Sequence, residues 1–466
     1  MLLSGTYSEA NMATVIGGDL ERRELPLVAL LFAVVAVTFG FILFRSPLMY
    51  GIDGPYYLIQ VKSILDTGTM SYVDPPFCFY FFALLSAVIG DPTAAIKLGT
   101  ILFCALTVIP AYLTGKRLTS SKPAAVASVV VCSLSAGLIA LGGEFVKNAV
   151  GSFFLLSLVY LCLRILKGDD TKATKVAAAA AFGLTALTHI LDLGLAVLFL
   201  ILLSTASFAM NVNRKGFLAF SLPLLGGSVL IGAAAYFAYS GYTIDIGKGF
   251  SFVNDFLESL ANYDANFRMI LGQGLPQYLS IGAGVVSLVL LWRKGRVSDA
   301  ILVGCSTTVL LLLNLPFVPR DWAWRFTLMS FVPMSHVLAA LIGLIGEKDI
   351  QWGITALLAL LFLVTQTLPG SEKVGPTITP QGYNDLIQMT QYVPPDSRVA
   401  SRVGGRYWVE YVLDSQAFKP PSSGGQLSYP TYFILGREDP LPPPGAVLLY
   451  RGIALSLYVV PPRTHF

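Results

Sequence analysis

Charge is what this 466-residue sequence most lacks. Only 12% of its residues are charged and 55% are hydrophobic, whereas a soluble domain carries about 25% charged residues. The mean hydropathy of +0.69 agrees with this balance. The formal net charge of +4 gives no sign of a nucleic-acid partner. The composition therefore predicts a protein that lies in a lipid bilayer and binds no nucleic acid.

Cysteine is scarce, and none lies in the polar C-terminal part of the chain. All five fall in apolar stretches: Cys78, Cys104, Cys132, Cys162 and Cys305. This distribution predicts neither a disulfide framework nor a thiolate zinc site. Walker, dinucleotide-binding, nucleophile-elbow and His-Glu-x-x-His patterns are also missing. The missing nucleotide loop fits an enzyme that draws on a lipid-linked donor. The first apolar run, Leu25 to Phe44, is too long for a signal peptide, and we expect it to remain as a span.

Long apolar runs, in contrast, are abundant, and a bilayer core needs about 20 apolar residues per helix. We predict about eleven spans: 25–45, 94–114, 122–141, 148–166, 174–188, 193–210, 217–239, 276–292, 299–316, 323–345 and 350–368. The run 75–90 is short and begins with two prolines, so we interpret it as a re-entrant or surface-lying helix. The predicted fold class is mainly α: a polytopic helical membrane bundle with juxtamembrane helices.

The basic residues orient this bundle, because cytoplasmic loops carry an excess of Lys and Arg. With 75–90 outside the span count, all basic loops fall on one side: 22–23, 116–122, 164–175, 214–215 and 293–296. The prediction is a multi-pass protein of the cell membrane with a cytoplasmic N-terminus and an extracytoplasmic C-terminus. Nearly every other polar residue between spans then faces the outer compartment.

Two further regions stand outside the spans. From about residue 370 the sequence changes to short strand and helix patterns with Pro-rich joints. We therefore predict a transmembrane domain at 1–369 and a small extracytoplasmic α/β domain at 370–466. The loop 240–275 exceeds the usual connection length, and we expect it to contain a short helix that covers the substrate site.

The stretch 51–68 after the first span holds a candidate catalytic acid. Asp53 precedes Gly54-Pro55, and apolar residues then follow helical spacing up to Gly68, which predicts a helix lying in the interface plane. Asp53 has two interpretations: the N-cap of this helix, or a catalytic carboxylate at the boundary of water and lipid. They agree only in part, because a capping carboxylate loses basicity.

Two other pairs of polar residues lie in the predicted outer loops. Glu144 and Lys147 are three residues apart, and they form either a surface ion pair or part of an acceptor or carrier site. His189 and Asp192 have the same spacing at the ends of two apolar runs. They are either a polar packing pair or a group that binds carrier phosphate or acceptor. A metal at the second pair would need Glu144 as a third ligand.

The order of motifs around Asp53 resembles a known family. An apolar span is followed by Asp-Gly-Pro-Tyr-Tyr, an amphipathic helix, Thr-Gly and Asp-Pro-Pro-Phe. This order is similar to the first external loop of the GT-C glycosyltransferases, which include protein mannosyltransferases, aminoarabinose transferases and oligosaccharyltransferases. The stretch 74–118 continues the match, and the resemblance covers 25–210 well and the rest in outline.

The resemblance implies a glycosyltransferase of the cell envelope. Its donor would be a sugar on polyprenyl phosphate, such as dolichyl phosphate, and its acceptor an extracytoplasmic protein, lipid or glycan. Asp53 would be the base that takes the acceptor proton, with Tyr56 and Tyr57 at the substrate. The departing phosphate needs cations, and Arg320 and Arg325 in Pro-Arg-Asp-Trp-Ala-Trp-Arg-Phe supply them. The alternative for these arginines is interfacial anchoring beside their tryptophans.

Departures from the family narrow this expectation. Oligosaccharyltransferases carry a paired-acid motif in the second external loop, where this chain has Glu144 alone, and their Trp-Trp-Asp-Tyr-Gly motif is missing. Both departures argue against transfer of whole glycans to asparagine. No cofactor is then required, although a divalent metal stays compatible with the site. The rival functions are a polyprenyl-linked lipid flippase or transporter, and a catalytically inactive binding subunit.

Overall fold

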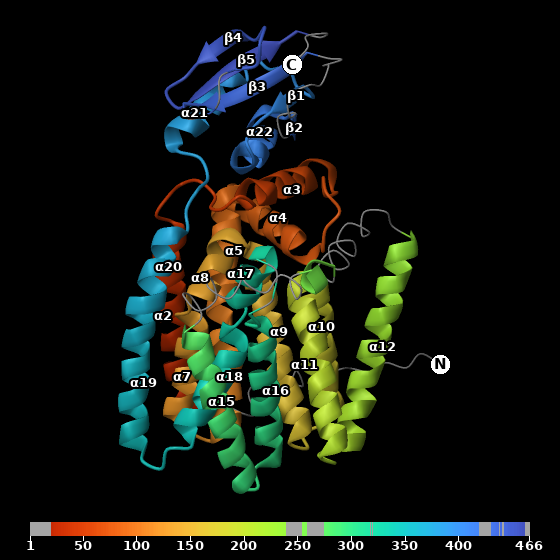
Figure 1. Cartoon of the computed structure of the whole chain (residues 1–466), viewed down its shortest axis with the longest axis vertical. Helices are drawn as coiled ribbons and strands as arrows, with labels where there is room; N and C mark the ends of the chain where they lie inside the picture. The colour runs from red at the N-terminus through yellow and green to blue at the C-terminus, as the bar shows by residue number, and fades with distance from the viewer. Residues whose placement is uncertain are drawn as a thin grey trace.

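The computed structural model describes residues 20–238, 254–258, 275–316, 318, 320–418, 430–437, 439 and 442–461. Most of them form helices that stand side by side in a bundle, and a five-stranded sheet lies beyond one end of it (Figure 1). The predicted fold class is confirmed. The predicted lid at 240–275 falls almost entirely outside the described residues, so it stays a prediction.

The bundle contains helices of very different lengths. They are η1 (Arg22–Glu24), α2 (Leu25–Leu43), α5 (Pro92–Leu106), α6 (Val108–Thr119), α7 (Lys122–Ser133), α8 (Ala136–Glu144), α9 (Val146–Leu166), α10 (Lys172–Ala186), α11 (Ile190–Ala209), α12 (Arg214–Ala238), α15 (Leu275–Arg293), α16 (Val297–Leu313), α17 (Arg320–Leu328), α18 (Phe331–Gly343), α19 (Lys348–Phe362), η2 (Leu363–Thr367) and α20 (Leu368–Lys373). Hydroxyl and carboxylate caps mark several starts, because a side-chain oxygen accepts an otherwise unpaired backbone N–H there. Asp91, Ser121, Ser135 and Thr171 are such caps.

Each predicted span coincides with a helix or a bent pair of helices. Within the described residues, seven helices are long and apolar enough to cross a membrane, and up to nine if two pairs bent by 43° and 42° are each one span. The predicted count of about eleven also includes α10 and α16, which have 15 and 17 residues. Among the described residues the shorter apolar helices are α16 and α4, and α10 is not one of them. The most enclosed candidate is α9, with 89% of its apolar window buried.

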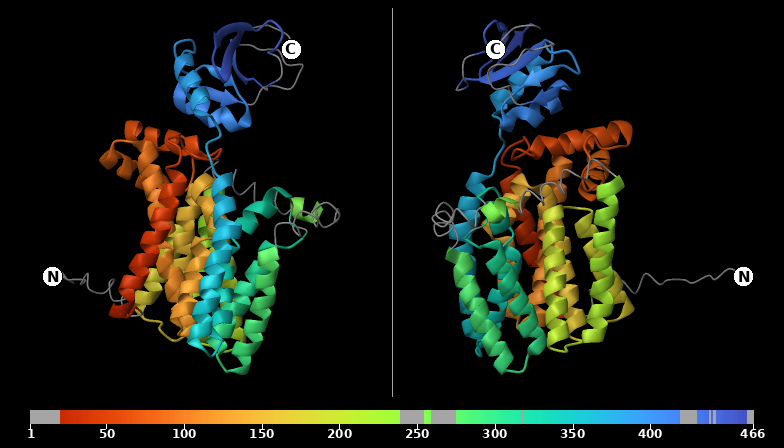
Figure 2. Two further views of the ribbon diagram at one scale, coloured as in Figure 1. Left: turned by 90° about the vertical axis from the view of Figure 1, so that its left-hand side faces the viewer. Right: turned by 45° about the vertical axis from the view of Figure 1, so that its right-hand side comes forward.

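Two helices lie at one end of the bundle and do not run along it. Figures 1 and 2 show α3 (Gly54–Thr67) lying across this end, with α4 (Phe77–Ile89) beside it. Pro55 in the first turn and Gly68, at φ 79°, start and end α3 as expected. Tyr57, Leu58 and Val61 on its inner side are buried. This is the placement expected of a helix in the interface plane, and we call this the outer end.

The basic loops meet at the opposite end, which we call the basic end. Lys167 Nζ lies 2.7 Å from Asp299 Oδ1 and also donates to the backbone oxygen of Arg117. Lys116 and Lys122 both approach Glu24 at the start of α2. The structure therefore gathers the loops that the sequence assigns to the cytoplasm, far from the sheet. Their cytoplasmic assignment remains a prediction.

The C-terminal sheet is mixed, with strand order β2-β1-β3-β5-β4. Its strands are β1 (Arg398–Ala400), β2 (Gln416–Phe418), β3 (Thr431–Gly436), β4 (Val447–Arg451) and β5 (Leu455–Val460), and its helices are α21 (Pro380–Met389) and α22 (Arg406–Leu413), with a turn η3 (Val403–Gly405). Figure 1 shows α22 between the sheet and α3, and Tyr72 Oη donates to Glu410 Oε2 at 2.7 Å across this contact. The predicted strands form, and β2 is an additional one.

Candidate functional site at the outer end

Asp53 occupies the N-cap position of α3, but its carboxylate does not cap the helix. Its backbone is helical, with φ −83° and ψ −8°, and no side-chain cap hydrogen bond is formed. Its backbone carbonyl oxygen forms the helical hydrogen bond at this position, accepting from the Tyr57 N–H at 3.2 Å. The partly exposed carboxylate therefore does not act as the N-cap of this helix, which was the alternative interpretation of Asp53.

Glu144 lies against the loop that leads to Asp53. Gly51 has φ +69°, and a Cβ there would come within 2.9 Å of the Glu144 Cα. The Gly51 N–H donates to Gly375 O at 2.9 Å, which fixes the loop in this position. The charge of Asp53 acts directly on Glu144. Asp53 at the start of α3 and Glu144 at the end of α8 are therefore near enough at the outer end for their charges to interact.

Glu144 does not pair with Lys147, as the surface ion-pair interpretation required. The helical path breaks at Phe145, with φ −124° and ψ 62°, between α8 and α9. Lys147 Nζ instead forms an ion pair with Asp74. Within the described residues, the Glu144 carboxylate has no hydrogen-bond or ion-pair partner, so it is available to a ligand.

Asp74 is the centre of a polar network that sequence reasoning missed. Besides Lys147, it accepts a hydrogen bond from Tyr56 Oη at 2.7 Å, and Gln60 Nε2 donates to the same hydroxyl at 3.0 Å. Burial, with the negative charge of Asp74, raises the pKa of Tyr56, so this hydroxyl stays a donor. Asp74 opens the Asp-Pro-Pro-Phe motif, which was the only available signal for it.

The Tyr57 side chain is buried, and its hydroxyl holds the backbone at the start of α9 in place. Its side chain is 1% exposed, and its hydroxyl accepts from the Lys147 N–H at 3.3 Å. Burial and the nearby Asp53 raise the pKa of Tyr57, so the hydroxyl is neutral. This contact ties α3 to the first turn of α9, the most enclosed span, and so holds Asp53 in register with the bundle.

His189, Asp192 and Asn148 form a second group near the start of α11. His189 Nδ1 accepts from the Leu191 N–H at 3.1 Å, and Asn148 Nδ2 lies 2.7 Å from the same nitrogen. Asn148 Nδ2 also donates to Asp192 Oδ2 at 3.3 Å. Nδ1 also lies 3.4 Å from Asp192 Oδ2. In the neutral imidazole, an Nδ1 that accepts from the Leu191 N–H leaves the proton on Nε2. Asn148 had no signal in the sequence beyond its nearness to Glu144.

Arg325 lies near the turn that follows Glu144. It is exposed, and its guanidinium carbon is 5.9 Å from the centre of the Phe145 ring. Trp324 packs on the same ring, with centroids 5.2 Å apart. Asp53 thus acts on Glu144 and Arg325 contacts the next residue, Phe145. The side chain of Arg320 lies outside the described part of the chain.

The metal prediction is not decided by this geometry. Within the described residues, no three His, Cys, Asp or Glu side chains lie close enough to hold a metal by themselves, so Glu144 does not complete a site with His189 and Asp192. A carboxylate pair such as Asp53 and Glu144 can still share Mg²⁺ with substrate phosphates. The independence of transfer from metal is a prediction that an assay in EDTA would check.

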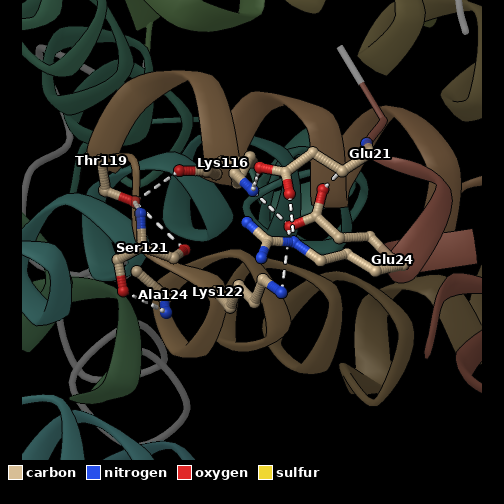
Figure 3. Close-up of polar contacts among 9 residues, drawn as sticks. Glu21, Glu24, Lys116, Thr119, Ser121, Lys122 and Ala124 are labelled. Atoms are coloured by element: carbon tan, nitrogen blue, oxygen red, sulfur yellow. Dashed lines mark hydrogen bonds and ion pairs between the residues drawn. The ribbon is translucent and has the colours of Figure 1, made fainter.

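A different charged cluster, at the basic end, holds helices together. Figure 3 shows Lys116 and Lys122 converging on Glu24, which is 0% exposed, with Lys122 Nζ at 3.8 Å. Glu21 and Glu24 form a reciprocal capping box, and Lys116 also lies 3.7 Å from Glu21. Here the buried acid is neutralised by cations, so the cluster joins α2, α6 and α7.

Comparison with known proteins agrees with this architecture. The family model of the dolichyl-phosphate-mannose-protein mannosyltransferases matches residues 73–231. An oligosaccharyltransferase of Archaeoglobus fulgidus, solved with Zn and sulfate, has TM-score 0.60 and 15% identity, covering 84% of this chain and 62% of that one. The arabinofuranosyltransferase AftD from Mycobacteria has TM-score 0.54 and 12% identity, covering 96% and 40%. No curated protein matches the chain in sequence.

The resemblance to the GT-C membrane glycosyltransferases is thereby confirmed, and the chain has their fold. The chain spans less than two thirds of the oligosaccharyltransferase it resembles. At this identity the structural likeness shows the fold alone. The activity must therefore be argued from the residues at the outer end.

Proposed function

We propose that this protein is a membrane glycosyltransferase that moves one sugar from a polyprenyl-phosphate-linked donor to an extracytoplasmic acceptor. One observation carries the proposal: at the outer end the Asp53 carboxylate, not used as a helix cap, lies beside Glu144. Like charges are costly to hold together, and such pairs cluster at functional sites. The mannosyltransferase family model and the dolichol-phosphate bound to a related oligosaccharyltransferase support a lipid-linked donor.

In this mechanism Asp53 is the general base. The acceptor O–H or N–H proton passes to its carboxylate while the acceptor atom bonds to the anomeric carbon. The bond from that carbon to the phosphate oxygen breaks, its electron pair leaves with the lipid phosphate, and the anomeric centre inverts. Arg325, exposed beside Phe145, neutralises the charge that develops on the phosphate. His189 Nε2–H is a further donor for carrier or acceptor.

The transporter alternative is less favoured by the helix breaks. A transporter is expected to place its charged groups on broken helices near the middle of the membrane. The two bent pairs do carry Glu144, at the end of α8, and Arg325, in α17. Their breaks, at Leu134-Ser135 and Met329-Ser330, carry no charge. The charged residues of the described chain gather at the two ends instead. An inactive subunit remains a rival that only an assay can separate.

The test replaces Asp53 by Asn, which keeps the shape and removes the base. We expect transfer from radiolabelled polyprenyl-phosphate sugars to fall by about 10³-fold, the usual scale for a lost general base. Expression and carrier binding should stay near the parent level. Asp66→Asn, on the exposed last turn of the same helix, is the matched control and should transfer normally. Parent-like turnover in Asp53→Asn would refute the assignment.

A further inference from the structure

A polar hollow of about 330 Å³ opens on the C-terminal sheet, away from the Asp53 region. Its walls include Arg437, just after β3, and Arg451, at the end of β4. Ser456 and Tyr458 of β5 and Asp439 add hydroxyl and carboxylate groups. None of these residues had a part in the sequence-based site.

Strand register places the hollow on one face of the sheet. Arg451 pairs with Ser456, and Ser456 pairs with Leu435, so these three side chains point to the same side. Leu457, on the opposite side of β5, is 0% exposed among the residues that contact α21 and α22. The two helices therefore cover the other face, and within the described residues the hollow faces away from them.

Both arginine-bearing turns are held in place by buried aspartates. Asp385 of α21 accepts from the N–H groups of Ile453, Ala454 and Leu455 at 3.2, 2.7 and 2.9 Å. These three bonds fix the β4–β5 turn next to Arg451. Asp439 Oδ2 accepts from the Gly436 N–H at 2.5 Å, which fixes the turn carrying Arg437. A site whose walls are preorganised loses little entropy when a ligand binds.

The hollow carries excess positive charge. Asp439 forms an ion pair with Arg402, so these two charges cancel. Arg437 and Arg451 are exposed, and within the described residues neither has an acidic or carbonyl partner. In the described part of the hollow, two guanidinium groups therefore lie beside hydroxyls without a counter-charge. Guanidinium groups match the planar geometry of carboxylates and the oxygens of phosphate, and hydroxyls bind sugar hydroxyls.

We infer that this hollow is a binding site for an acidic sugar, in which Arg437 and Arg451 bind the oxoanion and Ser456 and Tyr458 bind neighbouring hydroxyls. That the ligand is part of the acceptor rests on the proposed function; the site itself does not. One part of the acceptor would bind in this hollow on the sheet, and a different part of the same acceptor would react at Asp53. Binding and transfer are then separate properties with separate residues.

The experiment measures binding by calorimetry, using the full chain in detergent. The probes are trigalacturonate, its neutral counterpart galactotriose, and inorganic phosphate. The parent should bind trigalacturonate at least about tenfold more tightly than either other probe, because only it offers both anion and sugar. Arg437→Gln with Arg451→Gln should weaken trigalacturonate binding by about 100-fold, and each single change by about tenfold. Arg398→Gln, an exposed β1 arginine outside the hollow, should bind as the parent does.

Three outcomes would overturn the inference. They are no trigalacturonate binding by the parent, equal binding by parent and double variant, or phosphate binding as tight as that of trigalacturonate. Unchanged thermal unfolding of each variant shows that the sheet is intact. Asp53→Asn should retain full trigalacturonate binding, so failure of the catalytic proposal and failure of this one give different results.

Discussion

The two ends of the bundle both hold acidic residues that are out of bulk water, but they treat them in opposite ways. At the basic end, Glu24 is fully buried and receives two lysines. At the outer end, Glu144 has no cation in the described structure and lies beside a second acid, Asp53. The nearest lysine, Lys147, is bound by Asp74 instead.

This contrast separates charges that stabilise from charges that act. A buried carboxylate with its own cations lowers the free energy of the fold but is not available to a ligand. A carboxylate that lacks such partners costs stability and can bind or take a proton from another molecule. The chain therefore neutralises Glu24 where the basic loops are, and in the described structure it leaves Glu144 without a cation at the end with the sheet. The predictions below follow from this difference.

The largest stability effect is expected at the basic end. Glu24→Ala leaves Lys116 without its buried partner, and breaking a buried pair costs about 3–5 kcal/mol. Thermal unfolding in detergent should move to clearly lower temperature, while transfer per folded molecule stays unchanged. Glu347→Ala, at an exposed acid near the start of α19, is the control. A normal unfolding temperature in Glu24→Ala would contradict the structural role of this cluster.

The mirror experiment at the outer end should affect activity and spare stability. Glu144→Gln removes the negative charge that helps the Asp53 carboxylate attract a proton. We expect kcat to fall by about tenfold, or about 1.4 kcal/mol in the activation barrier. The unfolding temperature should stay level or rise, because Glu144 has no partner to lose. A drop in stability with normal kcat would place Glu144 in the same class as Glu24.

Arg325→Lys tests the phosphate role of the arginine that contacts Phe145. Lysine keeps the charge but loses the planar fork that binds two phosphate oxygens. The KM for the lipid-linked donor should rise by about tenfold, the scale of one hydrogen bond to a charged group. Arg398→Lys on the sheet is the matched control. An unchanged KM would leave Arg325 as an interfacial anchor beside Trp324.

The smallest effect concerns the contact between the sheet region and α3. Tyr72→Phe removes the 2.7 Å hydrogen bond to Glu410, at a cost of about 1 kcal/mol. Hydrogen exchange in α22 should become faster, while exchange in β5 stays the same. Faster exchange in β5 as well would mean that the sheet unfolds with the contact, which contradicts a local role.

The pH dependence of the same contact follows from the tyrosine. Burial and the bond to Glu410 raise the pKa of Tyr72 above its ordinary value of 10.0. A group whose pKa is raised by folding adds stability below its unfolded pKa and loses it as pH rises through the folded value. The protection of α22 amides, measured relative to the base-catalysed intrinsic exchange rate at each pH, should therefore be constant up to about pH 10 and decrease above it. The Phe variant should lack this step.

Sequence reasoning located the elements better than the contacts. The α3 helix could be predicted from Pro55, Gly68 and apolar spacing, because these are local preferences. The pairing of Lys147 could not, since its partner Asp74 lies 73 residues away and only the folded chain brings them together. For the same reason Glu144 looked like a partner of Lys147 at helical spacing, until the break at Phe145 turned them apart.

The arginine hollow shows a second limit. Arg437 and Arg451 stand in different turns, with no motif that joins them, and their common face follows from the register of β3, β4 and β5. Register depends on pairing between distant strands, which a single sequence does not encode locally. A reader of the sequence alone would have counted them as ordinary surface charges.

The amino-acid sequence alone determined that this chain is a membrane bundle, where its spans lie, and that its basic loops share one end. These properties follow from apolar run length and local charge, which act within about 20 residues. Only the tertiary structure decided that Glu24 is neutralised by lysines and that, within the described residues, Glu144 is not. The pairing of each acid depends on where a helix bends and on which distant side chains the fold brings close to it. The reason is that electrostatic energy falls with distance in space and not with separation along the chain.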